Sequence, residues 1–208
     1  MTDRATVLRE YHEGLDEGNV LGFFEEHRAL SNFHIEQFKY AGITWPASEN
    51  AFQAMKVHNP TRLTLLEFAA MTPAESKKEG RKAPIRPDWE TIKVKTMGDI
   101  LREKFTQCTY AKRVLLSTTG GVLEEHNWWR DTYWGIYGGA GQNWLGRILT
   151  DVRAELEMGL SKTGVPIPPK CPICYGPTTW AVVGNSVDCP ECGSFTMASG
   201  ILVPTNET

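Results

Sequence analysis

The chain has 208 residues, of which 41% are hydrophobic and 23% are charged, so it has enough apolar material for a folded core and is not wholly disordered. With 22 Lys and Arg residues against 25 Asp and Glu, the net charge of −3 excludes a generally basic nucleic-acid coat. No apolar run approaches the ~20 residues of a membrane span and the polar N-terminus shows no secretory signal, so we expect a cytoplasmic protein without membrane contact.

Helical periodicity dominates the chain up to residue 158. Apolar spacing predicts helices over residues 2–13, 48–57, 62–71, 72–80, 88–107, from 110 to the glycines at 120–121, and 143–158. Residues 72–75 (TPAE) have the pattern of a capping box with proline at the first helical position. Ser48 is the expected N-cap of the helix that it opens.

One β element interrupts this pattern. Phe38 and Tyr40 alternate with polar neighbours before Ala41-Gly42, and Ile43 and Trp45 do so after it. Such alternation on both sides of a short turn predicts a hairpin. The expected fold class is therefore a mainly α domain over residues 1–158 with a small β element, followed by a small β ribbon.

The C-terminal part begins with a Pro- and Gly-rich stretch, residues 159–170, which we interpret as a linker. Two CxxC pairs follow, with 14 residues between them. Such pairs can give four thiolates to one tetrahedral Zn²⁺, with a redox dithiol as the alternative. The expected ribbon covers residues 171–200, and its metal ligands are Cys171, Cys174, Cys189 and Cys192.

Sulfur would fill all four positions around this zinc, so we expect it to be structural and expect no cofactor for catalysis. The ribbon is also poor in cations. From Gly159 onward, the chain has two lysines against three acidic residues and no arginine. Because binding to a phosphate backbone depends on Lys and Arg, we expect the ribbon to contact protein or to stabilise the chain.

Three segments carry residues suited to chemistry, and the first is the helix after Trp45. Glu49, Gln53 and Lys56 fall at i, i+4 and i+7, so they share one helical face. Periodicity alone favours a solvated face with a spaced Glu/Lys pair, while the apolar residues of the same segment pack inward.

The second segment is rich in aromatic residues and glycine. Four of the seven tryptophans lie within residues 128–144, and glycines at 135–141 precede the helix start at Asn143. Backbone N–H groups there suit a phosphate or sugar hydroxyl, and a tight turn beneath aromatics is an equal alternative. Neither a Rossmann nor a P-loop motif is present. The third segment, residues 77–86, is basic, which by itself is a weak signal because such charges usually solvate a loop.

Taken in this order, these segments resemble the NADAR superfamily, which includes the YbiA-like riboflavin-intermediate N-glycosidases. The matching blocks are Leu30–Phe33, Trp45–Lys56, Gly80-Arg81, Arg86–Lys93, Lys104-Phe105, Asp131–Gly135 and Gly141–Leu149. Two features differ from the family. Asn50 and Ala51 stand where the family usually has histidine and an aromatic residue, and the compact members lack the C-terminal ribbon.

The resemblance implies a compact, mainly α domain that cleaves an N-glycosidic bond at ribose C1′. Such cleavage builds an oxocarbenium-like cation, which a carboxylate stabilises while a water is activated. Glu49 and Asp131 match positions that look catalytic in the family. Lys56 offers a second route, in which its amine attacks a ring-opened ribose as a Schiff base. The sequence leaves the water route and the lysine route open.

The resemblance also implies a set of substrate contacts. Trp89 and Trp134 would stack on the leaving base, and Arg81 would hold a phosphate or pyrophosphate. The remaining expected substrate-binding residues are Asn32, Gly135 and Asn143.

Two substrates fit this chemistry. One is a phosphorylated ribosylaminopyrimidine from riboflavin synthesis, and the other is ADP-ribose attached to guanine, where nucleic acid is a partner only as the modified substrate. A rival from another class is a non-catalytic module that binds NAD or ADP-ribose. Such a module would not need Glu49 and Asp131, and since both are present, we favour the enzyme.

Overall fold

The structure, a computed structural model, describes residues 2–159, 179–180, 186–189, 193–198 and 201–204. The chain divides into two compact units, residues 1–157 and residues 158–208. Apart from Gly159, the expected linker lies outside the described residues, and so do three of the expected zinc ligands, Cys171, Cys174 and Cys192.

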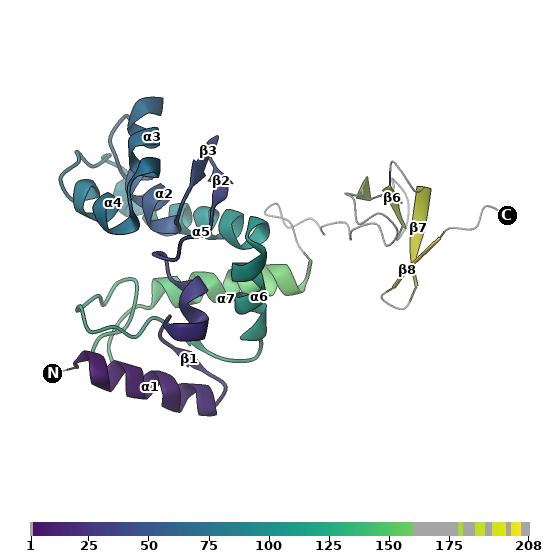
Figure 1. Ribbon diagram of the computed structural model, residues 1–208, viewed down its shortest axis with the longest axis horizontal. Coiled ribbons are helices and arrows are strands. Elements are labelled where there is room, and N and C mark those ends of the chain that lie inside the picture. Colours follow the sequence, from purple (N-terminus) through teal and green to yellow (C-terminus); the bar gives the residue numbers. More distant parts are fainter. Residues whose placement is uncertain (1, 160–178, 181–185, 190–192, 199–200, 205–208) are drawn as a thin grey trace. The chain divides into compact units, whose positions relative to one another are not determined.

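The first unit is mainly helical, as the periodicity predicts (Figure 1). Its helices are α1 (Arg4–Asp16), the 3₁₀ helix η1 (Glu25–Leu30), α2 (Ser48–Met55), α3 (Arg62–Ala70), α4 (Pro73–Gly80), α5 (Trp89–Gln107), α6 (Thr109–Ser117) and α7 (Trp144–Glu157). Its strands are β1 (Val20–Leu21), β2 (Phe38–Tyr40), β3 (Ile43–Trp45) and β4 (Leu123–Glu124). Within the described part of the chain, no helix combines the length and apolar composition needed to cross a membrane.

The helix starts show how local chemistry sets the boundaries. The capping box is confirmed: Thr72 Oγ1 accepts a hydrogen bond from Glu75 N, and the Glu75 carboxylate accepts one from Thr72 N at 2.8 Å. The expected cap at Ser48 is wrong, because α2 begins at Ser48 and has Ala47 as its N-cap without a side-chain hydrogen bond. A backbone carbonyl, Asn32 O, instead accepts from Glu49 N at 3.0 Å.

The predicted hairpin is confirmed, with β2 and β3 antiparallel and Phe38 opposite Trp45. Ala41 and Gly42 both have positive φ angles, 51° and 73°, which fits the two-residue turn favoured in hairpins. A second pairing was not predicted: β1 and β4 are parallel, with Val20 opposite Leu123. Strands of two residues leave no periodic signal, yet this pair brings the chain after β4 back to the N-terminal segment.

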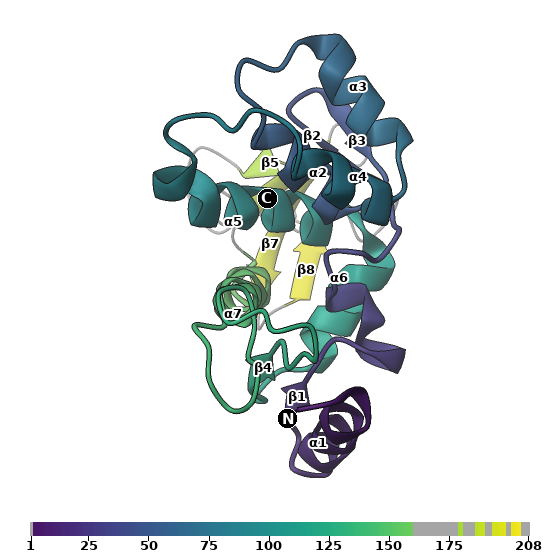
Figure 2. The same cartoon turned by 90° about the vertical axis from the view of Figure 1, so that its left-hand side faces the viewer.

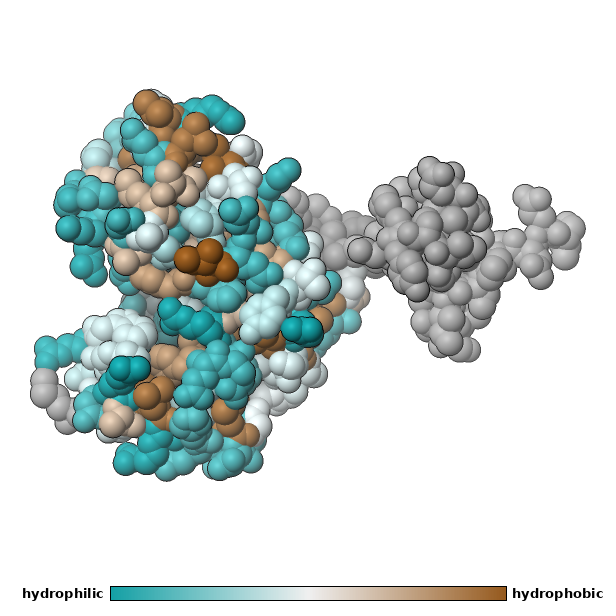
Figure 3. Space-filling model, in the orientation of Figure 1, coloured by the Kyte–Doolittle hydropathy of each residue, from teal (hydrophilic) through white to brown (hydrophobic). Residues whose placement is uncertain are grey.

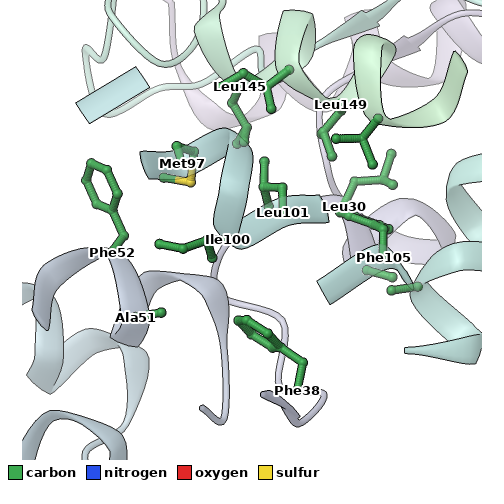
Figure 4. Close-up of a cluster of buried hydrophobic side chains, with 14 of the residues drawn as sticks. Leu30, Phe38, Ala51, Phe52, Met97, Ile100, Leu101, Phe105, Leu145 and Leu149 are labelled. Atoms are coloured by element: carbon green, nitrogen blue, oxygen red, sulfur yellow. The ribbon is translucent and has the colours of Figure 1, made fainter. Parts of the chain in front are cut away.

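Helix α5 is the centre of the first unit and lies between α2 and α7 (Figures 1 and 2). Figure 4 shows Ile100 and Leu101 of α5 between α2 and the leucines of α7, and all of these side chains are buried. Burial of such side chains is the main stabilising contribution to the fold. Phe52 and Met97 lie at one end of this cluster.

The second unit contains one antiparallel sheet in the strand order β5-β6-β7-β8. Its strands are β5 (Thr179–Trp180), β6 (Ser186–Cys189), β7 (Gly193–Ala198) and β8 (Ile201–Pro204). The expected ligand Cys189 is the last residue of β6 and pairs in register with Gly193.

Lys104 of α5 is a buried cation within the core of the first unit. Its ammonium donates hydrogen bonds to Ala29 O at 2.8 Å and to Ser31 O at 3.1 Å. Burial lowers the pKa of this lysine to about 8. The two hydrogen bonds hold the end of η1 and the segment that follows it against α5.

We expect the stability of the wild type, measured relative to Lys104→Met, to rise between about pH 7.5 and pH 9. The lysine pKa is about 8 in the folded chain against the usual 10.5, so the unfolded chain binds more protons in this range and stability increases with pH. The slope is at most about 1.4 kcal/mol per pH unit. Urea unfolding of both proteins at each pH measures it, and a difference that does not change with pH would contradict the assignment.

Candidate functional site

A cavity of about 560 Å³ opens in the first unit. Its walls come from η1 and the segment after it, α2, α4, α5 and the loop that follows β4. Figure 3 shows the surface hollowed between α4 and that loop. The lining residues are Phe23, Phe24, Arg28, Ser31, Asn32, Phe33, Glu49, Phe52, Gln53, Lys77, Arg81, Met97, Glu125, Trp129, Asp131 and Trp134.

The polar face of α2 forms one wall of this cavity. Glu49 and Gln53 are only 5% and 7% exposed, so the interpretation of this face as solvated is wrong. The segment around Asn32 covers it from one side through the hydrogen bond to Glu49 N, and the C-terminal end of α4 packs on it from the other. Tertiary packing of this kind leaves no trace in helical periodicity.

A chain of hydrogen bonds connects the three residues that the sequence placed on this face. Gln53 Nε2 donates to Glu49 Oε1 at 2.9 Å, and Lys56 Nζ donates to Gln53 Oε1 at 3.0 Å. A Cβ at Gly80 would overlap Gln53 Oε1 as the amide now lies and would come within 3.0 Å of Gln53 Cβ, so glycine permits this close approach of α4 to α2. Gln53 therefore orients Glu49. Lys56 is not among the residues that line the cavity.

Opposing influences set the ionisation of Glu49. Burial raises the pKa of its carboxyl, and Lys77, the hydrogen bond from Gln53, Lys56 and Arg81 each act to lower it. Burial also lowers the pKa of Lys56, which is opposed by the negative charge of Glu49. A buried carboxylate near several cations fits a site that stabilises positive charge during a reaction.

Asn32, one of the expected substrate-binding residues, lines the cavity beside Glu49. Asn32 is 8% exposed, and its side-chain Oδ1 atom has no hydrogen-bond partner among the described residues. A buried polar atom without a partner costs free energy, so a ligand hydroxyl or amine is the natural group to satisfy it.

Three cations line the cavity together with the carboxyl groups. Arg81 follows directly after α4, Lys77 lies one turn earlier, and Arg28 comes from η1. The family resemblance had indicated Arg81 as a phosphate-binding residue. Lys77 belongs to the basic segment 77–86, which by itself was only a weak signal. Arg28 gave no signal at all. Together they form a cluster able to bind a phosphate.

The loop after β4 supplies Asp131 and two tryptophans. Asp131 Oδ1 accepts hydrogen bonds from Tyr133 N and Trp134 N, both at 2.9 Å, so the carboxylate also holds the loop. Trp134 and the half-exposed Trp129 line the cavity. Their rings suit a planar base, because aromatic faces stack on such groups.

Trp89 does not line the cavity but lies one layer behind it. Its ring centroid is 4.9 Å from that of Phe52, which does line the cavity, and Trp89 is 4% exposed. The rings of Phe52 and Trp134 form a T-shaped pair with their centroids 5.2 Å apart. The structure therefore places Trp89 as a support for the aromatic wall.

Gly135 and Asn143 likewise lie outside the cavity lining. A Cβ at Gly135 would overlap Glu125 O, and Asn143 Oδ1 accepts a hydrogen bond from Glu125 N at 3.1 Å. Asn143 Nδ2 also donates to Leu123 O at 2.9 Å. Both residues hold the backbone around Glu125, in agreement with the interpretation of this segment as a packed turn.

Glu125 is a cavity-lining carboxyl that the sequence analysis missed. Burial, followed by the negative charge of Asp131, raises its pKa to about 8. The sequence offered no signal, because the residue stands among three charged or polar neighbours just after a two-residue strand.

The cavity thus combines three acidic side chains, three cations and an aromatic wall. Such a site can hold a planar base against the aromatics and a phosphate against the cations, with carboxyl groups at the bond between them. Among the sequence-predicted residues, those brought together at the lining are Asn32, Glu49, Arg81, Asp131 and Trp134.

Comparison with known proteins finds matches over this same unit. The NADAR domain family model matches residues 21–157. N-glycosidase YbiA of Escherichia coli is 33% identical over 144 residues, which span 67% of this chain and 89% of that protein. A riboflavin biosynthesis protein of Vibrio vulnificus is 39% identical over 136 residues, 64% of this chain and 36% of that protein.

The fold agrees with these matches. The solution structure of E. coli YbiA superposes with a TM-score of 0.58 at 34% sequence identity, covering 65% of this chain and 83% of that one. An N-glycosidase of Nostoc punctiforme is 31% identical over 147 residues, 68% of this chain and 94% of that protein.

Proposed function

The chain belongs to the NADAR family and is an N-glycosidase, and we propose that it hydrolyses the bond between nitrogen and ribose C1′ of a phosphorylated N-riboside. One observation carries the proposal: Glu49 and Asp131 line one cavity together with Arg28, Lys77 and Arg81. This arrangement has carboxylates for the ribosyl cation and cations for the phosphate, which is what such a reaction requires.

Glu49 is proposed to stabilise the oxocarbenium-like cation that forms at C1′, and Asp131 to activate the attacking water. Lys56 is the alternative nucleophile. Its ammonium binds Gln53 Oε1 at 3.0 Å and it does not line the cavity, which supports the water route.

For the substrate, we propose a ribosylaminopyrimidine phosphate of the riboflavin pathway. The names of relatives from Vibrio vulnificus and Zea mays as riboflavin biosynthesis proteins support this choice. In the complex that we propose, Trp134 and Trp129 contact the pyrimidine and Arg81 contacts the phosphate. ADP-ribose on guanine shares the ribose-to-nitrogen bond and is the competing substrate.

A substrate panel tests the proposal. The purified chain is incubated with a ribosylaminopyrimidine 5′-phosphate, with its dephosphorylated form and with ADP-ribosylated guanosine, and the products are separated by mass spectrometry. We expect the phosphorylated pyrimidine riboside to be cleaved with the highest kcat/KM. Faster cleavage of ADP-ribosylated guanosine would assign the other substrate.

Arg81→Ala is expected to raise the KM for the phosphorylated riboside by about 10- to 100-fold, with little change in kcat. The loss of a charge-assisted contact to the substrate phosphate costs about 1.5–3 kcal/mol. Steady-state kinetics measure the effect. Lys82→Ala is the matched control, because Lys82 is the next residue and its ammonium binds Glu79 at 2.6 Å outside the cavity. Equal KM values for the two variants would contradict the role.

We further propose that the C-terminal unit binds one structural Zn²⁺ through the four cysteines of the CxxC pairs. The supporting observation is the spacing of the pairs, which is typical of zinc ribbons. Metal analysis of freshly purified, reduced protein is expected to give one zinc per chain. Protein that folds without bound zinc would refute the proposal.

A further inference from the structure

The three carboxyl groups of the cavity differ in how they are held. Glu49 accepts a hydrogen bond from Gln53 Nε2, and Asp131 accepts two from backbone N–H groups. The carboxyl group of Glu125 makes no hydrogen bond and no ion pair with any residue that the structure describes, yet it lines the same cavity. Both of its oxygens are therefore available to a ligand.

The backbone of Glu125 is fixed even though its carboxyl group is not bonded. Its N–H donates to Asn143 Oδ1 at 3.1 Å, and its carbonyl accepts from Ile136 N at 2.9 Å. Gly135 permits the loop to approach that carbonyl, where a Cβ would overlap it. A carboxyl group on a rigid backbone that points into a cavity is placed for work on a ligand.

Burial, more than the charges around it, raises the pKa of Glu125 and keeps it protonated near neutral pH. Asp131 of the same loop and Glu49 of α2 raise its pKa, Lys77 of α4 and Arg28 of η1 lower it, and burial is the largest influence. Arg81 completes the charged groups of the cavity. With a pKa of about 8, the group can donate a proton where Asp131, beside it, serves as a base.

We propose that Glu125 is the general acid that protonates the leaving nitrogen. This rests on the proposed N-glycosidase function. As the C1′–N bond breaks, its electron pair passes to nitrogen, which takes the proton of the Glu125 carboxyl group. A water oxygen bonds to C1′ and gives its proton to Asp131. One water is consumed, and the products are the free amine base and a ribose with a hydroxyl at C1′. Exchange with solvent then removes the proton from Asp131 and restores the proton on Glu125, which returns the enzyme to its starting state.

The test compares two leaving groups. A ribosylaminopyrimidine 5′-phosphate needs a proton on its nitrogen, whereas nicotinamide leaves nicotinamide mononucleotide as a neutral base without one. Glu125→Gln is expected to lower kcat on the first by about 10²- to 10³-fold, and to change by less than about fivefold any cleavage of the second. Glu124→Gln is the matched control, since the neighbouring Glu124 binds His126 at 2.8 Å and does not line the cavity.

The outcomes separate the two proposals. If Glu125→Gln matches Glu124→Gln on the aminopyrimidine substrate, or if it slows both substrates equally, Glu125 is not the acid. If the wild type releases no base from any N-riboside, the proposed function itself fails and the acid fails with it. Where the wild type cleaves only the aminopyrimidine riboside, Glu125→Asp tests whether Glu125 is the acid. Its shorter carboxyl group should restore part of the activity that Glu125→Gln loses, and no restoration would overturn the assignment.

A second readout requires no alternative substrate. The wild type should lose kcat/KM as the pH rises through about 8, and Glu125→Gln should lack this basic limb. Because the folded pKa is raised, Glu125 reduces stability as the pH rises from about 4.5 to 8, so Glu125→Gln should gain melting temperature over the wild type across that range. A basic limb of the kcat/KM profile that is unchanged in Glu125→Gln, or a melting temperature that does not rise in this variant, would overturn the assignment.

Discussion

Glu49→Gln is expected to lower kcat by about 10²- to 10⁴-fold while the fold and ligand affinity stay intact. The amide has the size of the carboxylate, and its oxygen can still accept the hydrogen bond that Gln53 Nε2 now donates to Glu49 Oε1 at 2.9 Å. What it lacks is the negative charge beside the ribosyl cation. The positive charge on the ribosyl group develops only in the transition state. Loss of the carboxylate therefore reduces kcat and not ground-state binding.

Steady-state kinetics and calorimetric binding of ribose 5-phosphate separate these two quantities. Glu67→Gln is the matched control, since Glu67 lies exposed on α3 and is not part of the cavity. The control should behave as the wild type in both measurements. Wild-type kcat in Glu49→Gln would contradict a role for this carboxylate, and a lost melting transition would assign it to the fold.

Asp131→Asn should lower kcat over the same range, about 10²- to 10⁴-fold, again with the fold preserved. An asparagine oxygen can accept the hydrogen bonds from Tyr133 N and Trp134 N that Asp131 Oδ1 accepts, so the loop keeps its shape. Asp131→Ala is the contrast, because it leaves both N–H groups without that partner and should also lower the melting temperature. An asparagine variant with wild-type turnover would leave Asp131 as a loop residue only.

The double variant links the two carboxylates. If Glu49 and Asp131 act in one transition state, the double replacement should reduce kcat by less than the product of the two single losses. Measured kcat values for the wild type, both single variants and the double variant complete the cycle. Strictly multiplicative losses would indicate independent effects.

Local chemistry made much of the fold predictable. The capping box at residues 72–75 and the turn at Ala41-Gly42 depend on neighbours in the sequence, so their pattern is readable there. The parallel pair β1–β4 depends on segments about a hundred residues apart and has only two residues in each strand, too few for periodicity to appear. The cap at Ser48 failed because a carbonyl from Asn32, distant in sequence, binds Glu49 N.

The candidate site likewise contains some residues that the sequence could indicate and others that only the fold brings to the cavity. Glu49, Asp131 and Arg81 could be named because their motifs resemble a family, although helical periodicity treated the face of Glu49 as solvated. It is the packing of α4 at Gly80 and of the segment around Asn32 against this face that makes it a buried cavity wall. Glu125 and Arg28 have no motif, because what brings them to the cavity is the pairing of β4 with β1 and the position of η1.

Motif resemblance also does not distinguish a residue that lines a cavity from one that supports it. Trp89 packs behind Phe52, and Gly135 and Asn143 hold the backbone of Glu125. All three belong to the segments that resemble the family, and all three lie one layer away from the lining.

The most direct test of the account is product analysis of the wild-type chain with a ribosylaminopyrimidine 5′-phosphate, with the Glu49→Gln protein as the matched blank. We predict free aminopyrimidine and ribose 5-phosphate in equal amounts from the wild type, and at least about a hundredfold slower release from the variant. If the wild type binds the riboside or ADP-ribose yet releases no base from any N-riboside, the account of this cavity as a hydrolytic site is contradicted and it is a binding module.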